Sequence, residues 1–188
     1  MDQAYELAEV NIARLLEPLD SPRLKDFVAW LEPVNALADA SPGFVWRLVG
    51  DGGDDATALR ILDDDWLIVN ASVWVSPRHL RDFVYSDGHR AVLRRRREWF
   101  EKLGEAVTAL WWVPAGHRPT VAEDQERLVH LREHGPTPYA FGLHDDVPPP
   151  GGWPASVAVS SGAVSGGAVP GDAVSGGSLS GDPHDREA

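Results

Sequence analysis

The stretch WLIVNASVWV, residues 66–75, constrains the fold more than any other part of this chain. Successive residues of a β-strand point to opposite faces, so its alternation predicts a strand with two unlike faces. The aliphatic face, suited to packing under helices, carries Leu67, Val69, Ala71, Val73 and Val75. The aromatic face carries Trp66, Ile68, Asn70, Ser72 and Trp74. Because exposed tryptophans are costly, we expect a second surface to cover the aromatic face and to enclose a small-molecule cavity.

The order of the predicted elements indicates an α+β domain. Alternating apolar residues predict strands at 5–15, 44–49, 57–62, 66–75 and 106–113. Helical periodicity and capping signals predict helices at 21–40, 77–85, 89–103 and 120–134. Pro33 is expected to kink or divide the first helix. This order favours a ferredoxin-like fold, with a mostly antiparallel sheet and helices packed on one face.

A change of composition divides the chain. Residues 1–147 hold the predicted helices and strands, and we expect them to form one domain. Residues 148–188 are rich in Pro, Gly, Ser, Ala and Val and nearly free of large apolar side chains. Such a segment cannot bury enough apolar surface to offset the entropy of ordering, so we predict a disordered C-terminal tail.

Charge and composition exclude several classes of partner. The formal net charge of −12 repels phosphate backbones, so nucleic acid is not expected as a partner. The sequence contains no signal-like start and no apolar run long enough for a membrane span, which predicts a cytoplasmic protein without a membrane partner. The segment HLREH at 130–134 has the spacing of inverted zinc proteases, but both histidines lie away from the apolar face of their helix. We therefore predict no metal site.

Four consecutive arginines, Arg94 to Arg97, are the most unusual feature of an acidic chain. On a helix, neighbouring residues point about 100° apart, so these four cannot grip one phosphate strand together. Three of them fall on a solvated face. The helical wheel of residues 89–103 places Arg96 within the apolar face, beside His89. A guanidinium there needs an internal acid such as Glu9 or a bound anion, and both interpretations stay open.

Further side chains could line the cavity. Where two tryptophans, or a tryptophan and an arginine, are adjacent in a strand, their side chains point to opposite faces of the sheet. One side chain of each pair therefore needs a covering surface. His117 follows a glycine in the loop before the last helix, a common place for site residues. The candidate ligand-binding residues are Asn11, Trp46, Ser72, Trp99, Trp112 and His117.

The sequence resembles the family known as domain of unknown function 3291 over roughly residues 5–143. The stretches that carry the resemblance are NALADASPGFVWRL, SVWVS, FVYSDGHRAVLRRRREWF, LWWVPAGHRPTVAE and HGPTPYAF. The resemblance implies a dimeric α+β barrel, in which the sheets of two ferredoxin-like units face each other across a lumen. That superfamily includes cofactor-independent monooxygenases of antibiotic biosynthesis, haem enzymes related to chlorite dismutase, and spheroidene monooxygenase, so the fold alone does not choose the function.

The resemblance extends to two residues by type. Asn70 and Trp74 are similar to the pocket Asn and Trp of quinone-forming monooxygenases. In such a mechanism Asn70 would bind a phenolate or enolate, Trp74 would stack on the ring, and Arg96 would stabilise negative charge before oxygen attack. Ala71, where a larger residue is expected, and Pro33 depart from the pattern.

Three functions are compatible with such a cavity. The first is an oxygenase-type enzyme for a hydrophobic or aromatic metabolite, with Asn70, Trp74, His89 and Arg96 as candidate catalytic residues. The second is a haem protein, with His89 or His117 as axial ligand and Arg96 pairing a propionate. The third is a homodimer that binds a small hydrophobic molecule without catalysis.

Overall fold

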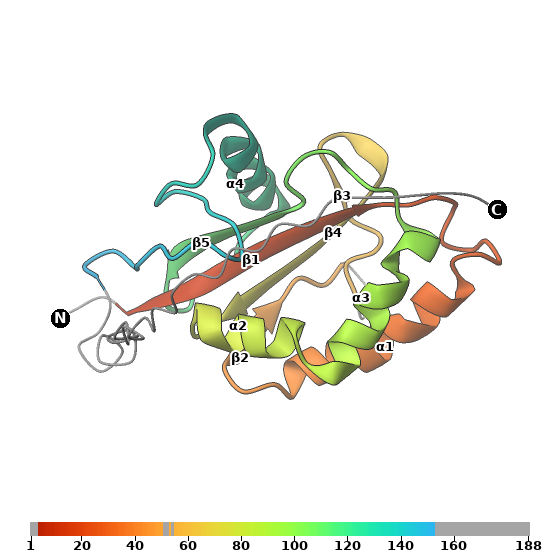
Figure 1. Cartoon of the computed structure of the whole chain (residues 1–188), viewed down its shortest axis with the longest axis horizontal. Helices are drawn as coiled ribbons and strands as arrows, with labels where there is room; N and C mark the ends of the chain where they lie inside the picture. The colour runs from red at the N-terminus through yellow and green to blue at the C-terminus, as the bar shows by residue number, and fades with distance from the viewer. Residues whose placement is uncertain (1–3, 51–52, 54, 153–188) are drawn as a thin grey trace, which may run out of the picture. The chain divides into compact units, whose positions relative to one another are not determined.

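The computed structural model describes residues 4–50, 53 and 55–152. The strands are β1 (Tyr5–Arg14), β2 (Phe44–Arg47), β3 (Arg60–Ile61), β4 (Asp64–Trp74) and β5 (Thr108–Pro114). The helices are α1 (Lys25–Asp39), α2 (Pro77–Val84), α3 (Asp87–Trp99) and α4 (Val121–His134) (Figure 1). The predicted tail lies outside the described residues from residue 153 onward. In the described part of the chain, no helix is long and apolar enough to cross a membrane.

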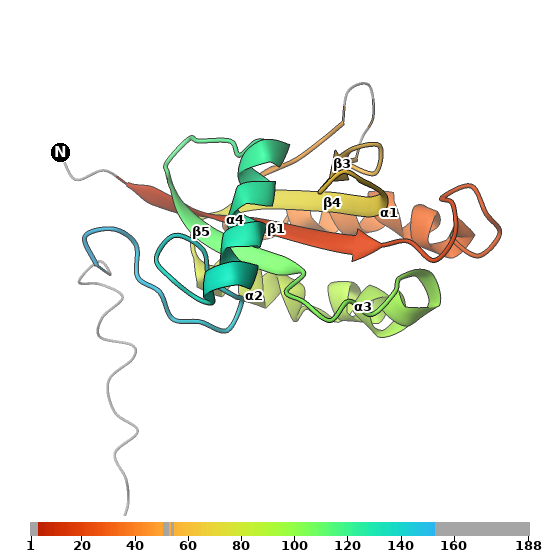
Figure 2. The same ribbon diagram turned by 90° about the horizontal axis from the view of Figure 1, so that it is seen from above.

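One antiparallel sheet has the strand order β2-β4-β1-β5, with β3 paired to β4 as an extra hairpin. Without β3, the elements follow the order strand, helix, strand, strand, helices, strand. The first strand lies inside the sheet, between β4 and β5. Together these features define the ferredoxin-like topology. Helices α1, α2 and α3 lie on one side of this sheet and α4 lies on the other (Figures 1 and 2). The predicted α+β class and ferredoxin-like sheet are therefore confirmed, and α4 adds a helix to the second face.

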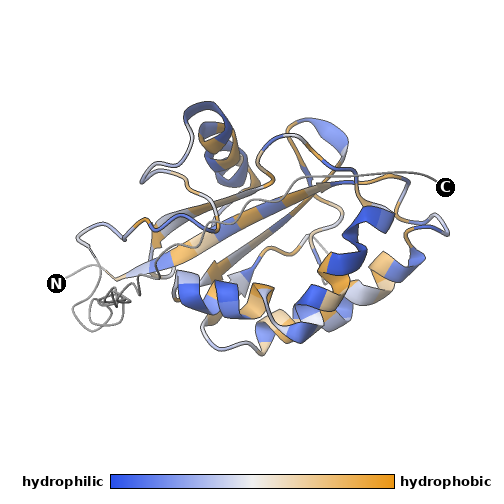
Figure 3. Ribbon diagram, in the orientation of Figure 1, coloured by the Kyte–Doolittle hydropathy of each residue, from blue (hydrophilic) through white to orange (hydrophobic). Residues whose placement is uncertain are grey.

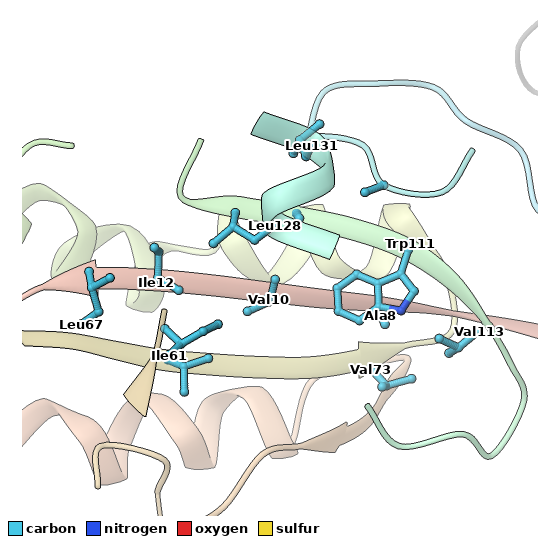
Figure 4. Packing of buried hydrophobic residues seen from close by; sticks show 13 residues of the cluster. Ala8, Val10, Ile12, Ile61, Leu67, Val73, Trp111, Val113, Leu128 and Leu131 are labelled. Atoms are coloured by element: carbon cyan, nitrogen blue, oxygen red, sulfur yellow. The ribbon is translucent and has the colours of Figure 1, made fainter. Parts of the chain in front are cut away.

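The aliphatic face of the sheet is buried under α4. Leu128 and Leu131 of α4 lie against Val10 and Trp111 in one continuous cluster (Figure 4). Leu62 N donates to the Gln125 side chain, which ties the β3 hairpin to α4. This face therefore has cover from within the chain.

The aromatic face is covered by the other three helices. Trp74 packs with Ala38 of α1 and Leu80 of α2 in one cluster. Ile68 packs with Phe27 of α1 and Trp99 of α3 in a second cluster. The two clusters lie at opposite ends of the face.

The aliphatic face packs under a helix as predicted, but the cover of the aromatic face differs from the prediction. The alternation within β4 is as expected, but α1, α2 and α3 cover the aromatic face, which was assigned to a partner. A strand pattern shows which residues share a face and not which layer will meet that face. Bulky rings such as Trp74, 1% exposed, fill the space beneath these helices. The homodimer, inferred from an uncovered aromatic face, stays a prediction.

Two predicted helices differ from the structure in an informative way. Helix α1 runs through Pro33 without being divided. Helix α3 ends at Trp99, because Phe100 is extended, at φ −126° and ψ 145°, and bridges to Leu15. The prediction that this helix continues to residue 103 is wrong. The arginine-rich end of α3 is strongly hydrophilic (Figure 3).

Candidate functional site

Three cross-strand rows of side chains cross the aromatic face of the sheet. Directly opposite residues of neighbouring strands share a face, so the strand register defines these rows. The aromatic row contains Phe44, Trp74, Leu7 and Trp112. The charged row contains Arg47, Ser72 and Glu9. The amide row contains Asn70, Asn11 and Thr108.

The charged row places an acid inside the domain. Glu9 is 8% exposed, and its Oε2 accepts a hydrogen bond of 2.9 Å from Ser72 Oγ. Ser72 Oγ in turn accepts a 2.9 Å hydrogen bond from Trp74 Nε1, so serine and indole hold each other in place. Burial raises the pKa of Glu9 to about 7, although the Ser72 hydrogen bond opposes the shift. A carboxyl with this pKa is half ionised near neutral pH, as a general base requires.

The amide row lies beside this acid and reaches solvent. Asn11 Nδ2 donates to Thr108 Oγ1 at 2.8 Å, which fixes the Asn11 amide. Asn70, directly opposite Asn11, is exposed although it belongs to the face that the helices cover. The two apolar clusters flank this row, so solvent reaches the sheet between them. The Asn70 amide is therefore accessible from solvent one row from the Glu9 carboxyl.

Aromatic rings connect the aromatic row to α2 and α3. Phe83 of α2 stacks on Trp74 with ring centres 5.2 Å apart. The His89 ring contacts Phe83 at 4.7 Å, and its Nδ1 lies 3.0 Å from the carbonyl oxygen of Val84. Burial lowers the pKa of His89, a shift that the Val84 hydrogen bond partly opposes. His89 therefore supports Phe83 and Trp74 as a neutral imidazole.

The structure brings several predicted residues to this face. They are the predicted catalytic Asn70 and Trp74 and the predicted ligand-binding Asn11, Ser72 and Trp112. His89 joins them through Phe83. Trp112 also donates from Nε1 to the carbonyl of Val147, which closes the end of the aromatic row.

Arg96 is not on the buried side of α3, contrary to prediction. It is exposed, and its NH1 donates 2.9 Å to the carbonyl oxygen of Leu93. On the wheel Arg96 lies between Val92 and Leu93, but in the structure its long side chain reaches solvent one turn before the end of the helix. Arg95 is the anchored arginine, because it pairs with Asp26 and lies over the Trp99 ring at 5.0 Å.

Three further predicted residues lie away from the rows. Trp46 is opposite Val73 and packs on the aliphatic face. Trp99 is buried in the apolar cluster at the far end of the aromatic face. His117 is exposed in a groove of about 590 Å³ beside α4, with its Nε2 2.7 Å from Glu123 Oε2.

The haem alternative stays a prediction, and one of the residues predicted for it, Arg96, is not inside the domain. His117 and His89 each have a ring nitrogen engaged, by Glu123 and by the Val84 carbonyl. Arg96, the expected propionate partner, lies exposed on α3. No group of three or more potential metal-ligating side chains occurs in the part of the chain that the structure describes.

From the sequence, Glu9 was considered only as an internal acid that could pair with Arg96. Glu9 was not among the predicted site residues. Two signals could have found it. Glu9 alternates with apolar residues in β1, and it shares a face with Asn11. A carboxyl group within an otherwise apolar strand has to be protonated or paired when it is buried. Such a residue is therefore a candidate for a functional site.

Comparisons with known proteins gave a family match and several distant structural similarities. Residues 6–156 match the family described as Domain of unknown function (DUF3291). No curated protein matches the chain. SnoaB, described as a cofactor-independent oxygenase from Streptomyces nogalater, is 19% identical over 61% of this chain and 97% of its own, with a TM-score of 0.41.

Two other solved structures are similar at lower identity. A conserved protein from Methanosarcina mazei is 12% identical over 59% of this chain and 93% of its own, with a TM-score of 0.42. A ferredoxin-like protein of the dabb family from Mesorhizobium loti is 15% identical over 59% and 99%, with a TM-score of 0.37. The family match spans most of the sequence, and the chain therefore belongs to the DUF3291 family.

Proposed function

We propose that this protein binds a small aromatic molecule on the helix-covered face of its sheet and oxygenates it without a cofactor. Glu9 is the general base. Asn70 binds the oxygen that becomes negative when the substrate loses a proton, and Trp74 holds Ser72, the hydrogen-bond partner of Glu9. The observation that carries the proposal is the buried Glu9 carboxyl beside Ser72, one row from an amide pair that solvent reaches.

The chemistry needs only dioxygen as co-reactant. Glu9 removes a proton from an acidic CH₂ group next to a phenol or carbonyl, and the resulting anion transfers electrons to dioxygen to form a carbon–oxygen bond. Glu9 returns the proton to the peroxide, which then loses water to leave a carbonyl group. The CH₂ carbon is oxidised and dioxygen is reduced, with one oxygen atom retained in the product and one released as water.

Several features support these roles. The pKa of Glu9, raised to about 7 by burial, lets it accept a proton near neutral pH and hold it. Asn70 offers an amide donor to an oxyanion at the solvent-accessible part of this face, between the two apolar clusters. The reaction class rests on the resemblance of Asn70 and Trp74 to the pocket residues of quinone-forming monooxygenases.

Oxygen uptake with anthrone as substrate tests the proposal. Glu9→Gln preserves an acceptor for Ser72 but removes the base, so we expect the rate to fall by about 10²-fold or more. Glu6→Gln is the matched control, because Glu6 lies on the same strand with its side chain on the opposite face, where it pairs with Arg118. Equal rates in the wild type and Glu9→Gln would refute a base role. Binding of anthrone without oxygen uptake would leave a non-catalytic binding protein.

We also propose that the protein is a cytoplasmic homodimer, as the family resemblance implies. Val75 and Tyr85 are exposed to 51% and 47%, so apolar surface is available at the end of β4 and α2. Light scattering coupled to gel filtration measures the mass directly. A mass of one chain at micromolar concentration would contradict the dimer.

A further inference from the structure

Arg47 extends the charged row beyond the residues used in the proposed reaction. It lies on β2 directly opposite Ser72, which is itself opposite Glu9 on β1. Its side chain is 18% exposed, so the guanidinium is largely withdrawn from water. A largely buried guanidinium with bidentate geometry is well suited to bind a carboxylate.

The partners of Arg47 include a carboxylate that shows how an anion can approach it. Arg47 Nε donates 3.0 Å to Asp39 Oδ1, and its second terminal nitrogen lies 3.4 Å from Asp39 Oδ2. Asp39 is the last residue of α1 and its side chain is 45% exposed. Asp39 is the more exposed member of this pair, so a ligand carboxylate can approach Arg47 from the same side as Asp39.

We propose that Arg47 selects substrates that carry a carboxylate, and that Asp39 occupies this position until the substrate arrives. This inference rests on the proposed function of the Glu9 site. Neighbouring strands lie about 4.8 Å apart, so Arg47 and Glu9, two strands apart, are separated by roughly 10 Å along the sheet. That span fits an aromatic ring system with a carboxylate at one end and an acidic group at the other.

Calorimetric titration of the full chain with 6-hydroxy-2-naphthoate and with its methyl ester tests the selection. The two probes share one ring system and differ in the carboxylate charge. The wild type should bind the acid about tenfold more tightly than the ester, the factor expected for one charge-assisted contact. Arg47→Gln should remove this difference by weakening only the acid.

Asp39→Asn separates selection from a merely structural ion pair. It removes the competing carboxylate, so binding of the acid should tighten while binding of the ester stays the same. Arg14→Gln is the control, because Arg14 is also a strand arginine in an ion pair but projects from the opposite face of β1. It should leave the acid-to-ester ratio unchanged.

Three outcomes would contradict the role of Arg47 in substrate selection or the proposed base role of Glu9. Equal weakening of both probes by Arg47→Gln, or weaker acid binding in Asp39→Asn, would show that the pair only holds α1 to β2. Failure of both probes to bind the wild type would overturn the carboxylate class. A failure of the Glu9 base role is seen separately, as oxygen uptake that is unchanged in Glu9→Gln while the acid-to-ester ratio still depends on Arg47.

Discussion

Asp124 is a buried acid without a hydrogen-bond partner, and its replacement should stabilise the protein. It lies on the buried side of α4 with 0% exposure, and within the described residues neither carboxylate oxygen has a partner. Burial, with the nearby charges of Glu9 and Glu123, raises the pKa of Asp124 from 3.8 to about 8. The folded protein therefore holds a proton at pH 7 that the unfolded chain releases.

The size and sign of the effect follow from this shift. At about 1.4 kcal/mol per pKa unit, the folded state is destabilised by about 4 kcal/mol at pH 7 relative to a neutral side chain. Because the folded pKa is the higher one, stability decreases as pH rises from about 4 to about 8. Asp124→Asn removes the titration while keeping the shape of the side chain, so the variant should lose this part of the pH dependence.

Urea unfolding followed by tryptophan fluorescence, from about pH 5.5 to about pH 8, measures the difference between the two proteins. We expect the advantage of Asp124→Asn in unfolding free energy to grow by about 3 kcal/mol over this range. The control is Asp82→Asn, which removes a carboxylate that is 71% exposed and should give a curve parallel to the wild type. Parallel curves for Asp124→Asn and the wild type would refute the reasoning.

Two further predictions concern local packing. Arg95→Ala should lower the urea midpoint of unfolding, because Arg95 pairs with Asp26 and covers the Trp99 ring. Arg96 is exposed, so Arg96→Ala should leave the midpoint unchanged. Equal midpoints for the two variants would mean that the assignment of the α3 faces is wrong. Gly43→Ala should lower the unfolding free energy by about 2 kcal/mol or more. Gly43 has φ +76°, and a Cβ there would lie 2.3 Å from the His79 ring. A variant whose thermal unfolding midpoint equals that of the wild type would contradict this.

The sequence predicted the grouping of strand residues well, because alternation depends only on backbone geometry. It assigned Asn70, Ser72 and Trp74 to one face, and the register places them there with Asn11. It could not show which layer covers that face, because both faces of β4 carry apolar side chains that need burial. That choice depends on how the helices fit around Trp74, which is a property of the packed domain.

The helix faces were harder to predict than the strand faces. Strand alternation assigns a side chain to one of two faces, but a helical wheel does not show which part of a helix a neighbouring element covers. The wheel placed Arg96 on the apolar side of α3, but the structure leaves its side chain exposed, and Arg95 is the residue with anchoring contacts. Glu9 was noticed as an internal acid but not as a base, because its burial and raised pKa arise from residues far away in sequence.

The most direct test of the central claim is the titration of Glu9 itself. Carbon-13 NMR of glutamate side-chain carboxyls should show one group with a pKa of about 7, raised by burial, and this signal should be missing in Glu9→Gln. Adding anthrone should shift that signal, because the substrate lies against the carboxyl. If every glutamate titrates in the ordinary acidic range, Glu9 is not the base of this site. The same conclusion follows if anthrone does not change the chemical shift of the Glu9 carboxyl.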